Sequence, residues 1–505
     1  MYHANHIFLD WAPVDLEEVD RIEIIKGPGA IFYGGSAFSG VINIITKTPK
    51  QLKGTQINMQ AGNWGTVRTN LVHAGSYKKL DYSIAAGHRE AKEWEAPNIP
   101  PERERFFVDH IAGKAIYHLD ETSSLSFAGR YSDADHVISR MCNPDTTFLA
   151  LRYDRPDFWA RVFYNNHEKT FWNDTFSVKD SNREFEFLRS WRWKKNITSF
   201  GGYAKHTAWS IRSLEGEHAG ITEGHAVEDY ALNVENEYRA NDKLIFVLGG
   251  RGEYYTHLDF LGLGRGSVIY NPSAAESIRF TIASGYYIPS LFQHTNQGWV
   301  CPLALGNASL KEEKITSYEL SYRKGLTESL RLRISVFYND YEDLIDNTEM
   351  GPMKNIADAY QYGGELHLDF RLADWLTGYA NYAYQDIQRG DFGDLAVDPE
   401  HKVNCGLRAK FSKWSANLGF HYVDRYYEIY STSNPVYGRV KPGPSRVDSY
   451  TTVDARIAYC PNENLEFSVA ARNLFNDTHY ESNSIGSLTG DRVGRTITAG
   501  VGYRF

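Results

Sequence analysis

This chain is most constrained by the regular alternation of apolar and polar residues along many short runs. In SLSFAGRY, Leu125, Phe127 and Tyr131 fall on one face of a strand, whereas Ser126 and Arg130 fall on the other, because successive side chains of a strand point to opposite faces. The run RTITAGVGYRF (495–505) alternates in the same way. A half-buried sandwich strand and a membrane-barrel strand both produce this pattern, so alternation predicts β-structure without choosing between them.

The lengths of the connections between these runs favour a barrel. Tight polar turns at residues 78–80, 120–123, 194–196, 241–243, 373–374, 412–413 and 461–464 alternate with long irregular segments. The long segments include AKEWEAPNIPPERER, SLEGEHAGITEGHAVE, IPSLFQHTNQGWVCPLALGNASLKEEK and EIYSTSNPVYGRVKPGPSR. Short connections at one rim and long ones at the other are typical of an outer-membrane barrel. We therefore predict an all-β fold, a transmembrane antiparallel β-barrel of about 22 strands, a width at which barrels contain a plug.

Composition agrees with β-structure and excludes several other classes of protein. Aromatic residues make up 14% of the chain, beside 42 glycines, and these residue types favour strands and turns. No stretch approaches the roughly 18 uninterrupted apolar residues of a spanning helix. A net charge of -9 leaves no basic face for nucleic acid. The four cysteines show no CxxC spacing and no partner histidine cluster, so we expect neither a metal site nor a cofactor.

One dense motif, RIEIIKGPGAIFYGGSAFSGVINIITKTPK (21–50), differs from the other strand-like runs. It places two apolar strand-like pieces around a Gly-Pro-Gly corner and a Tyr-Gly-Gly tip. The motif resembles the closing plug segment of TonB-dependent outer-membrane receptors. Further similarity to that family lies in NASLKEEKITSYELSYR (307–323), VFYNDYEDLIDN, KNIADAYQYGGELHL, ARNLFNDTHYES (471–482) and the terminal GVGYRF.

The resemblance implies two domains and a transport function. Residues 1–52 would be the C-terminal part of a plug domain and residues 53–505 the β-barrel, so the fold includes a partial N-terminal plug segment. The implied function is active, TonB-coupled uptake of a scarce nutrient, chiefly a ferric siderophore, with haem or cobalamin as alternative ligands. The protein would be a receptor in the outer membrane of a Gram-negative bacterium and not an enzyme.

The same resemblance implies a set of partners. We expect contact with outer-membrane lipid and with the TonB complex, and recognition of Phe505 by the barrel assembly machinery. The ligand would be a small molecule such as a ferric siderophore. We expect a monomer that binds no nucleic acid.

The first residues, MYHANHIFLDWAPVD, lack the basic and apolar regions of a signal peptide. In the family, a signal peptide, a TonB-contacting segment and an earlier plug portion come before the motif that residues 21–50 resemble. We therefore expect an N-terminally truncated receptor without the TonB-contacting segment and most of the plug, either a fragment or the downstream half of an interrupted gene. A purposeful short form, a passive outer-membrane pore and a non-functional receptor remnant are the alternatives.

The motif at 21–50 contains both structural and ligand-binding candidates. We expect Ile22, Ile24 and Ile25 to pack in a small core. The expected structural residues of the plug are Arg21, Glu23, Gly27, Pro28, Gly34 and Gly40, among which the glycines permit turns that other residues resist. By resemblance to siderophore receptors, the tip residues Phe32, Tyr33 and Ser36 would reach the ligand.

The segment YYIPSLFQHTNQGWVCPLALGNASL (286–310) supplies further ligand-binding candidates. Haem receptors of the family carry an axial histidine in the corresponding loop, between two motifs that this chain matches poorly. His294 lies in that interval, and a neutral imidazole is a suitable iron ligand. The aromatic candidates, which either contact a ligand or belong to the membrane rim, are Tyr286, Tyr287, Phe292 and Trp299.

The cysteine positions predict one disulfide, and the sequence contains no recognisable catalytic motif. Cys142 and Cys301 fall in predicted extracellular loops, where oxidation is favourable, so we expect a disulfide between them. Cys405 falls in a strand and Cys460 at a short turn, and these two are not expected to pair. An outer-membrane enzyme would need a nucleophile, a base and an acid on one rim, and no recognisable motif supplies them. A diffusion porin fits the strands but not the motif at 21–50.

Overall fold

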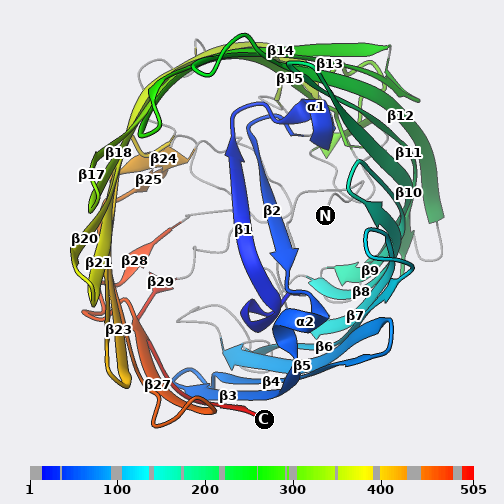
Figure 1. Cartoon of the computed structure of the whole chain (residues 1–505). Coiled ribbons are helices and arrows are strands. Elements are labelled where there is room, and N and C mark those ends of the chain that lie inside the picture. Colours follow the sequence, from blue (N-terminus) through cyan, green and yellow to red (C-terminus); the bar gives the residue numbers. More distant parts are fainter. Residues whose placement is uncertain are drawn as a thin grey trace.

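The structure is a large barrel that surrounds a short hairpin (Figure 1). This computed structural model describes residues 14–34, 37–92, 105–135, 142–171, 176–214, 222–258, 260–290, 293–294, 304–346, 351–389, 398–428, 445–481 and 492–505. In these ranges, no helix has both the length and the apolar character needed to cross a membrane.

The barrel is antiparallel and closed, with 22 strands. Neighbouring strands pair in chain order, and β30 pairs with β3 to close the ring, with Tyr503 opposite Ile57. The strands are β3 (Gly54–Gly62), β4 (Val67–Tyr77), β5 (Leu80–Lys92), β6 (Arg105–His118), β7 (Ser124–Asp135), β8 (Cys142–Arg155), β9 (Phe158–Phe171), β10 (Phe176–Trp193), β11 (Asn196–Ser213), β12 (Thr222–Arg239), β13 (Leu244–Tyr255), β14 (Leu261–Ser273), β15 (Glu276–Tyr287), β17 (Glu313–Thr327), β18 (Leu330–Asp346), β20 (Lys354–Ala373), β21 (Leu376–Arg389), β22 (His401–Phe411), β23 (Trp414–Val423), β26 (Tyr450–Tyr459), β27 (Leu465–Arg472) and β30 (Thr496–Arg504). The predicted fold class and strand number are confirmed.

Tight turns join the strands at one rim. They comprise residues 78–79, 119–123, 156–157, 194–195, 240–243, 274–275, 328–329, 374–375, 412–413 and 460–464. Every tight turn predicted from the sequence is among them, to within a residue. Phe505 lies at the same rim, where its amide donates to the Thr55 carbonyl at 2.8 Å.

The opposite rim carries the longer connections and three small sheets. These sheets pair β16 (Ala304–Leu305) with β19 (Gly351–Pro352), β24 (Tyr426–Glu428) with β25 (Ser445–Val447), and β28 (His479–Tyr480) with β29 (Arg492–Val493). The connection from β3 to β4 at this rim is short, residues 63–66, which the predicted alternation of lengths did not include.

The outer surface of the barrel is apolar, as a lipid-facing surface must be. Leu71, Ile84, Phe127 and Leu248 all expose large parts of their side chains on it. Aromatic side chains ring the short-turn rim, including Tyr77, Tyr117, Trp193, Trp375 and Trp414. Nearer the other rim, tyrosine rings of adjacent strands contact one another, as in Tyr318, Tyr338 and Tyr360. An apolar band between two aromatic girdles is the pattern of a barrel in a bilayer.

The inner surface of the barrel is polar where it is buried. Asn70, Ser132, Asn182, Arg251 and Glu253 are among the most buried polar side chains. Arg130 faces inward while Phe127 and Tyr131 are exposed on the outside, which confirms the two faces predicted for SLSFAGRY. The distribution is the reverse of that in a water-soluble barrel with a packed apolar core.

A short hairpin crosses the inside of the barrel. It consists of η1 (Leu16–Glu18), β1 (Val19–Lys26), α1 (Ala30–Tyr33), β2 (Gly40–Thr46) and α2 (Pro49–Leu52), and we call these elements the inner hairpin. β1 and β2 pair antiparallel, with Ile24 opposite Ile42. α1 lies against β12 to β15 and α2 against β4 to β6, so the hairpin spans the lumen between two walls (Figure 1).

The predicted structural residues shape the corner of the inner hairpin. Gly27 and Gly34, at φ of 71° and 90°, occupy the left-handed region that favours glycine. Gly40 faces the opposite strand so closely that a Cβ there would lie 2.7 Å from the Ile25 carbonyl oxygen. Pro28 is buried between these turns.

The expectation of a small core of three isoleucines is wrong for two of them. Ile22 and Ile24 are 49% and 65% exposed. They lie on one face of a two-stranded sheet, and none of the described elements covers that face with a second layer. Ile25, on the other face, is half-buried and packs near Gly29.

Candidate functional site

The α1 tip of the inner hairpin presents two aromatic side chains to the lumen. Phe32 and Tyr33 are 37% and 47% exposed, whereas Ile31 between α1 and the wall is 3% exposed. Partial burial, and then the charge of Glu23, raise the pKa of Tyr33. Its hydroxyl therefore stays protonated at neutral pH and can donate a hydrogen bond. Ser36, the third predicted tip residue, lies outside the described residues.

An apolar core fixes the α1 tip to the barrel wall. Ile31 packs there with wall residues that include Trp209, Ile211 and Tyr286. The wall comes close because Gly249 has no side chain, and a Cβ on it would lie 2.7 Å from Ile31 Cδ1. Full burial of an isoleucine side chain is worth about 1.5–3 kcal/mol.

A buried charged network lies directly beneath the tip, and we call Tyr203, Arg251, Glu253 and Tyr286 the Arg251 network. Arg251 Nε donates to Glu253 Oε2 at 2.7 Å, and Arg251 Nη1 donates to the Ile31 carbonyl of α1 at 3.2 Å. Tyr203 and Tyr286 donate to the two oxygens of Glu253, at 3.0 and 2.8 Å. The Arg251 guanidinium also lies over the Tyr203 ring, 4.7 Å from its centroid. The network pairs the buried Arg251 and Glu253 charges and ties them to α1.

The predicted loop aromatics occupy different environments. Tyr286 is buried and belongs to the Arg251 network, so it supports the tip from below and has almost no exposed surface for a ligand. Tyr287 is half-buried, and its ring meets Phe38 of the inner hairpin edge-on, with centroids 6.5 Å apart. Phe292 and Trp299 lie outside the described residues. The structure therefore brings Tyr287, but not Tyr286, to the surface around the tip.

His294 is buried beside a second histidine. It is 5% exposed, and its ring centroid lies 5.8 Å from that of His257. Burial, and then the nearby His257, lower the pKa of His294 to about 4, so the imidazole is neutral at physiological pH. Neither ring nitrogen has a hydrogen-bond partner among the described residues.

Arg21 and Glu23 act within the inner hairpin. Arg21 Nε donates to Glu23 Oε1 at 2.7 Å, and Asn43 Nδ2 of β2 donates to Glu23 Oε2 at 3.3 Å. The Asn43 bond joins β1 to β2, whereas the Arg21–Glu23 contact lies within β1. The structural role of both residues stays a prediction. Farther along β1, Lys26 forms an ion pair with Glu365 of β20.

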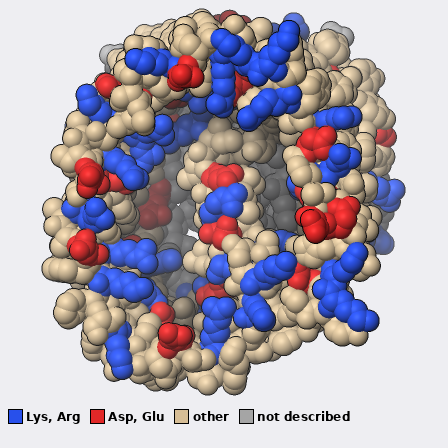
Figure 2. Space-filling model, in the orientation of Figure 1, with Lys and Arg blue, Asp and Glu red and all other residues tan. Residues whose placement is uncertain are grey.

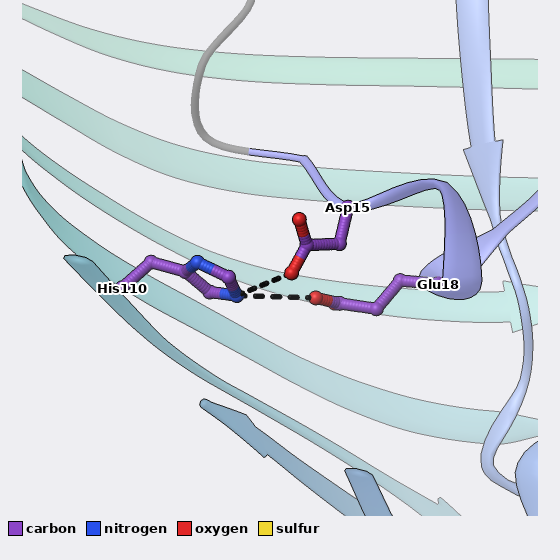
Figure 3. A group of neighbouring side chains, drawn as sticks. All are labelled: Asp15, Glu18 and His110. Atoms are coloured by element: carbon purple, nitrogen blue, oxygen red, sulfur yellow. Dashed lines mark ion pairs between the residues drawn. The ribbon is translucent and has the colours of Figure 1, made fainter. Parts of the chain in front are cut away.

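The other end of the inner hairpin is held by charges (Figure 3). Arg68 Nη2 lies 3.1 Å from Asp15 Oδ1, and Arg130 Nη2 lies 2.6 Å from Glu18 Oε2. His110 Nε2 of β6 points between the two carboxylates, 3.2 Å from Asp15 Oδ2 and 3.6 Å from Glu18 Oε1. We call Asp15, Glu18 and His110 the His110 cluster.

The ionised state of Glu18 depends on the side chains that face it. Burial alone would raise the pKa of Glu18, but the facing His110 ring and the Arg130 guanidinium together bring that pKa below its ordinary value of 4.5. Glu18 is therefore a carboxylate at neutral pH. Ion pairs therefore attach the η1 end of the hairpin to the barrel.

A third feature is a cavity of about 1060 Å³ on the lumen side of strands β18 to β27. Its charged lining consists of Arg331, Arg371, Arg408, Arg456 and Arg472 with Glu328, Asp369 and Asp454. Figure 2 shows lysine and arginine side chains gathered around the rim of the lumen in that view. The lining has more arginines than carboxylates, so it favours anionic over cationic solutes.

Comparison with known proteins identifies the family. The family model described as "TonB dependent receptor-like, beta-barrel" matches residues 51–474. The chain belongs to the TonB-dependent receptor family. It is 21% identical to the vitamin B12 transporter BtuB of Vibrio cholerae serotype O1, over 98% of this chain and 81% of that protein. It is 24% identical to the ferric enterobactin receptor of Pseudomonas aeruginosa, over 79% of this chain and 67% of that receptor.

A solved structure shows the same fold. The copper transporter OprC superimposes with a TM-score of 0.79 at 16% identity, covering 98% of this chain and 87% of that chain. Membership of the family and a transmembrane barrel place this TonB-dependent receptor in the outer membrane of a Gram-negative bacterium. The relatives are named as transporters and receptors, not as enzymes. The comparisons give no support to a passive pore or a receptor remnant.

The wall residues that hold the inner hairpin were not predicted from the sequence. Arg251 and Glu253 are two apart on β13 and so share the inward face. A pair of opposite charges at that spacing in an otherwise alternating strand is a signal that could have found them. Asp15 and Glu18 carry no comparable local signal, because their partners come from β4, β6 and β7.

The disulfide expectation falls largely outside the described residues. Cys142 is the first residue of β8, and its side chain and Cys301 are not among the described positions. Cys405 in β22 and Cys460 beside the 460–464 turn are free, as expected. A bridge between Cys142 and Cys301 stays a prediction.

Proposed function

We propose that this receptor imports a ferric siderophore actively, with energy supplied through the TonB complex. The observation that carries the proposal is the inner hairpin, which spans the lumen and is fastened to two opposite walls. An element in that position controls passage through the barrel. We also propose that residues 1–52 belong to the plug domain and residues 53–505 to the barrel.

The choice of ligand is supported by the surface around the tip and by the lumen wall. Phe32 and Tyr33 offer exposed aromatic surface, with Tyr287 nearby, and aromatic rings suit the flat groups of a catecholate. The arginine-rich cavity of about 1060 Å³ provides room and positive charge for an anionic ferric complex. One curated relative is named a ferric enterobactin receptor.

Cobalamin is the second candidate ligand, favoured by the similarity to the vitamin B12 transporter BtuB over 98% of this chain. Haem is less well supported, because His294 is buried and its surface is not open to a ligand in the structure. Cobalamin delivers cobalt, whereas a ferric siderophore and haem both deliver iron, and the three molecules can be labelled separately. One uptake experiment therefore separates them.

The experiment measures uptake in an outer membrane that lacks other siderophore and cobalamin receptors. Cells producing residues 1–505 joined behind the signal peptide, TonB-contacting segment and earlier plug portion of a family member are given iron-55 bound to a catecholate siderophore, labelled cyanocobalamin or haemin, with and without a working TonB complex. We expect TonB-dependent accumulation of iron-55 alone. Accumulation of only cobalamin or haemin would assign the other ligand, and accumulation that does not depend on TonB would overturn active import.

Variants of the tip refine the test. Replacing Phe32 and Tyr33 by alanine should lower ligand binding about tenfold or more, because two aromatic contacts are lost. The matched control is Tyr77→Ala, an exposed tyrosine at the short-turn rim. If both variants bound the ligand equally well, the tip would not belong to the ligand-binding site.

Two further partners belong to the proposal. Phe505 is 66% exposed at the short-turn rim, and its ring packs edge-on against Tyr503. We propose that the barrel assembly machinery recognises this exposed aromatic end. We also propose that the receptor works as a monomer in outer-membrane lipid.

A further inference from the structure

The His110 cluster contains buried atoms that the ion pairs leave without partners. The His110 side chain is 4% exposed, and the Asp15 and Glu18 side chains are each 11% exposed. His110 Nε2 and Glu18 Oε1 make no hydrogen bond with any described residue, although they face each other at 3.6 Å. A buried polar atom without a partner costs about 1–3 kcal/mol. Something besides these three side chains is needed to satisfy both atoms.

The spacing of the three ligand atoms suits a metal ion. His110 Nε2 lies 3.2 Å from Asp15 Oδ2 and 3.6 Å from Glu18 Oε1, and all three atoms lie within 4.8 Å of one another. Ligands held at about 2.0–2.2 Å from one Zn²⁺ ion are separated by roughly 3.0–3.5 Å. Figure 3 shows one oxygen of Asp15 and one of Glu18 facing the same nitrogen of the His110 ring.

Neighbouring groups orient the two carboxylates. Arg68 and Asn70 hold Asp15, with Asn70 Nδ2 donating to Oδ2 at 2.6 Å, and Arg130 holds the other oxygen of Glu18. Such outer contacts fix carboxylates in metal sites. Gly87 leaves space for the His110 ring, because a Cβ on Gly87 would lie 2.4 Å from His110 Cε1.

The charge around the cluster is close to balanced. Two guanidinium groups face three carboxylates, namely Arg68 and Arg130 against Asp15, Glu17 and Glu18. The Lys47 ammonium is a further cation beside them, since it donates to the Glu17 carbonyl at 2.8 Å. Geometry and the two unpartnered buried atoms, and not an excess of negative charge, point to a ligand here.

We propose that Asp15, Glu18 and His110 bind a divalent transition-metal ion, with Zn²⁺ as the ion that best fits one imidazole and two carboxylates. The ion joins η1 of the inner hairpin to β6 of the barrel. It thereby cross-links the barrel to the end of the hairpin that is otherwise held by ion pairs. The expectation of no metal site rested on cysteine spacing, and these ligands come from separate segments that no local motif reveals.

The test uses the full chain, purified in detergent and stripped of metal by a chelator. Zn²⁺ is titrated into the protein by calorimetry, and Co²⁺ is used as a spectroscopic probe of nitrogen and oxygen ligands. The variants are His110→Gln and, as the matched control, His88→Gln on the neighbouring strand. His88 directs Nδ1 at Asp109 and Nε2 at Glu90, so no single nitrogen of it faces two carboxylates.

We expect one tightly bound Zn²⁺ per chain, a loss of affinity of at least about tenfold in His110→Gln, and unchanged affinity in His88→Gln. Folding of each variant is checked by its heat-dependent mobility in gels. If His110→Gln does not fold, Glu18→Gln removes a ligand and keeps the size of the side chain. Absence of tight binding, or binding that survives both ligand substitutions, would overturn the site.

Discussion

The two ends of the inner hairpin are attached to the barrel by different physics. At the α1 end, Ile31 is buried in an apolar core, and the Arg251 network beneath it is almost completely shielded from water. At the η1 end, Asp15 and Glu18 face Arg68, Arg130 and His110, and the apolar contact is limited to a small cluster around Leu52. The hairpin has a packed end and a charged end.

The difference predicts which end releases first. Apolar burial does not depend on pH and is not weakened by salt. Attraction between charges falls when a carboxylate is protonated or when ions screen it. An element that must move to let a ligand pass would move most easily at its charged end, with the packed end as the pivot.

The largest loss of stability is expected when the packed end is disrupted. Glu253→Ala leaves Arg251 as an unpaired charge, and the two side chains are 0% and 1% exposed. We expect the free energy of unfolding to fall by about 3–5 kcal/mol. The measurement is denaturant-induced unfolding in detergent micelles.

A surface pair provides the control for Glu253→Ala. Arg456 and Glu466 form an ion pair whose side chains are 38% and 42% exposed, so Glu466→Ala should cost less than about 1 kcal/mol. Replacing Arg251 by Met together with Glu253 by Leu should recover most of the loss, because no buried charge remains. Similar losses for Glu253→Ala and Glu466→Ala would show that the packed end does not depend on its buried network.

Acid should loosen the charged end alone. The pKa of Glu18 is lowered in the folded protein from its ordinary 4.5, so its contribution is complete above that value and is lost as the pH falls through 4.5 toward the folded pKa. A charge-assisted hydrogen bond is worth about 1.5–3 kcal/mol. We expect the charged end to open at least tenfold more often in acid.

Hydrogen exchange at two amides measures this difference. The Lys47 amide donates to the Glu18 carbonyl at 2.8 Å, and the Gly29 amide donates to the Ala37 carbonyl at 3.2 Å near α1. Between pH 6 and about pH 3.5, protection of Lys47 should fall and that of Gly29 should not. Glu18→Gln should remove the pH dependence at Lys47. Parallel loss at both amides would mean that the two ends open together.

Gly34→Ala should weaken the packed end by a smaller amount. Gly34 has φ of 90°, and a Cβ there would lie 3.4 Å from the Tyr203 hydroxyl. Placing alanine in a left-handed conformation costs about 1–2 kcal/mol. The control is Gly262→Ala, where a Cβ would meet nothing within 4 Å. The two variants are compared by thermal unfolding, and equal stabilities would show that the turn at Gly34 relaxes without strain.

The barrel was predictable from the sequence because its rules are local. Alternation assigns Phe127 and Arg130 to opposite faces, and short turns such as 412–413 mark one rim, so strand number and orientation follow without knowledge of any partner. Phe32 and Tyr33 became candidates through the resemblance of the motif at 21–50 to a plug segment, and their contact with a ligand stays a prediction. Both depend on residues close together in the sequence.

The attachments of the hairpin were not predictable because their partners are distant. His110 is one of 17 histidines, and nothing near it in the sequence indicates that it faces Asp15. Ile22 and Ile24 show the opposite error, because apolar residues in a strand suggested a core that a two-stranded sheet does not provide. In each case the missing information is which wall lies beside the hairpin.

The smallest expected effect concerns a third contact, between Lys26 of β1 and Glu365 of β20. Their side chains are 64% and 31% exposed, so solvent screens the pair and its coupling should be below about 1 kcal/mol. A double-mutant cycle with Lys26→Gln and Glu365→Gln measures that coupling at low and high salt. A value near zero at high salt leaves the hairpin with two attachments and keeps the packed end as the pivot. A salt-independent coupling of several kcal/mol would mean that β20 also holds the α1 end of the hairpin firmly, because Lys26 is the last residue of β1 and pairs with Gly40 beside the corner.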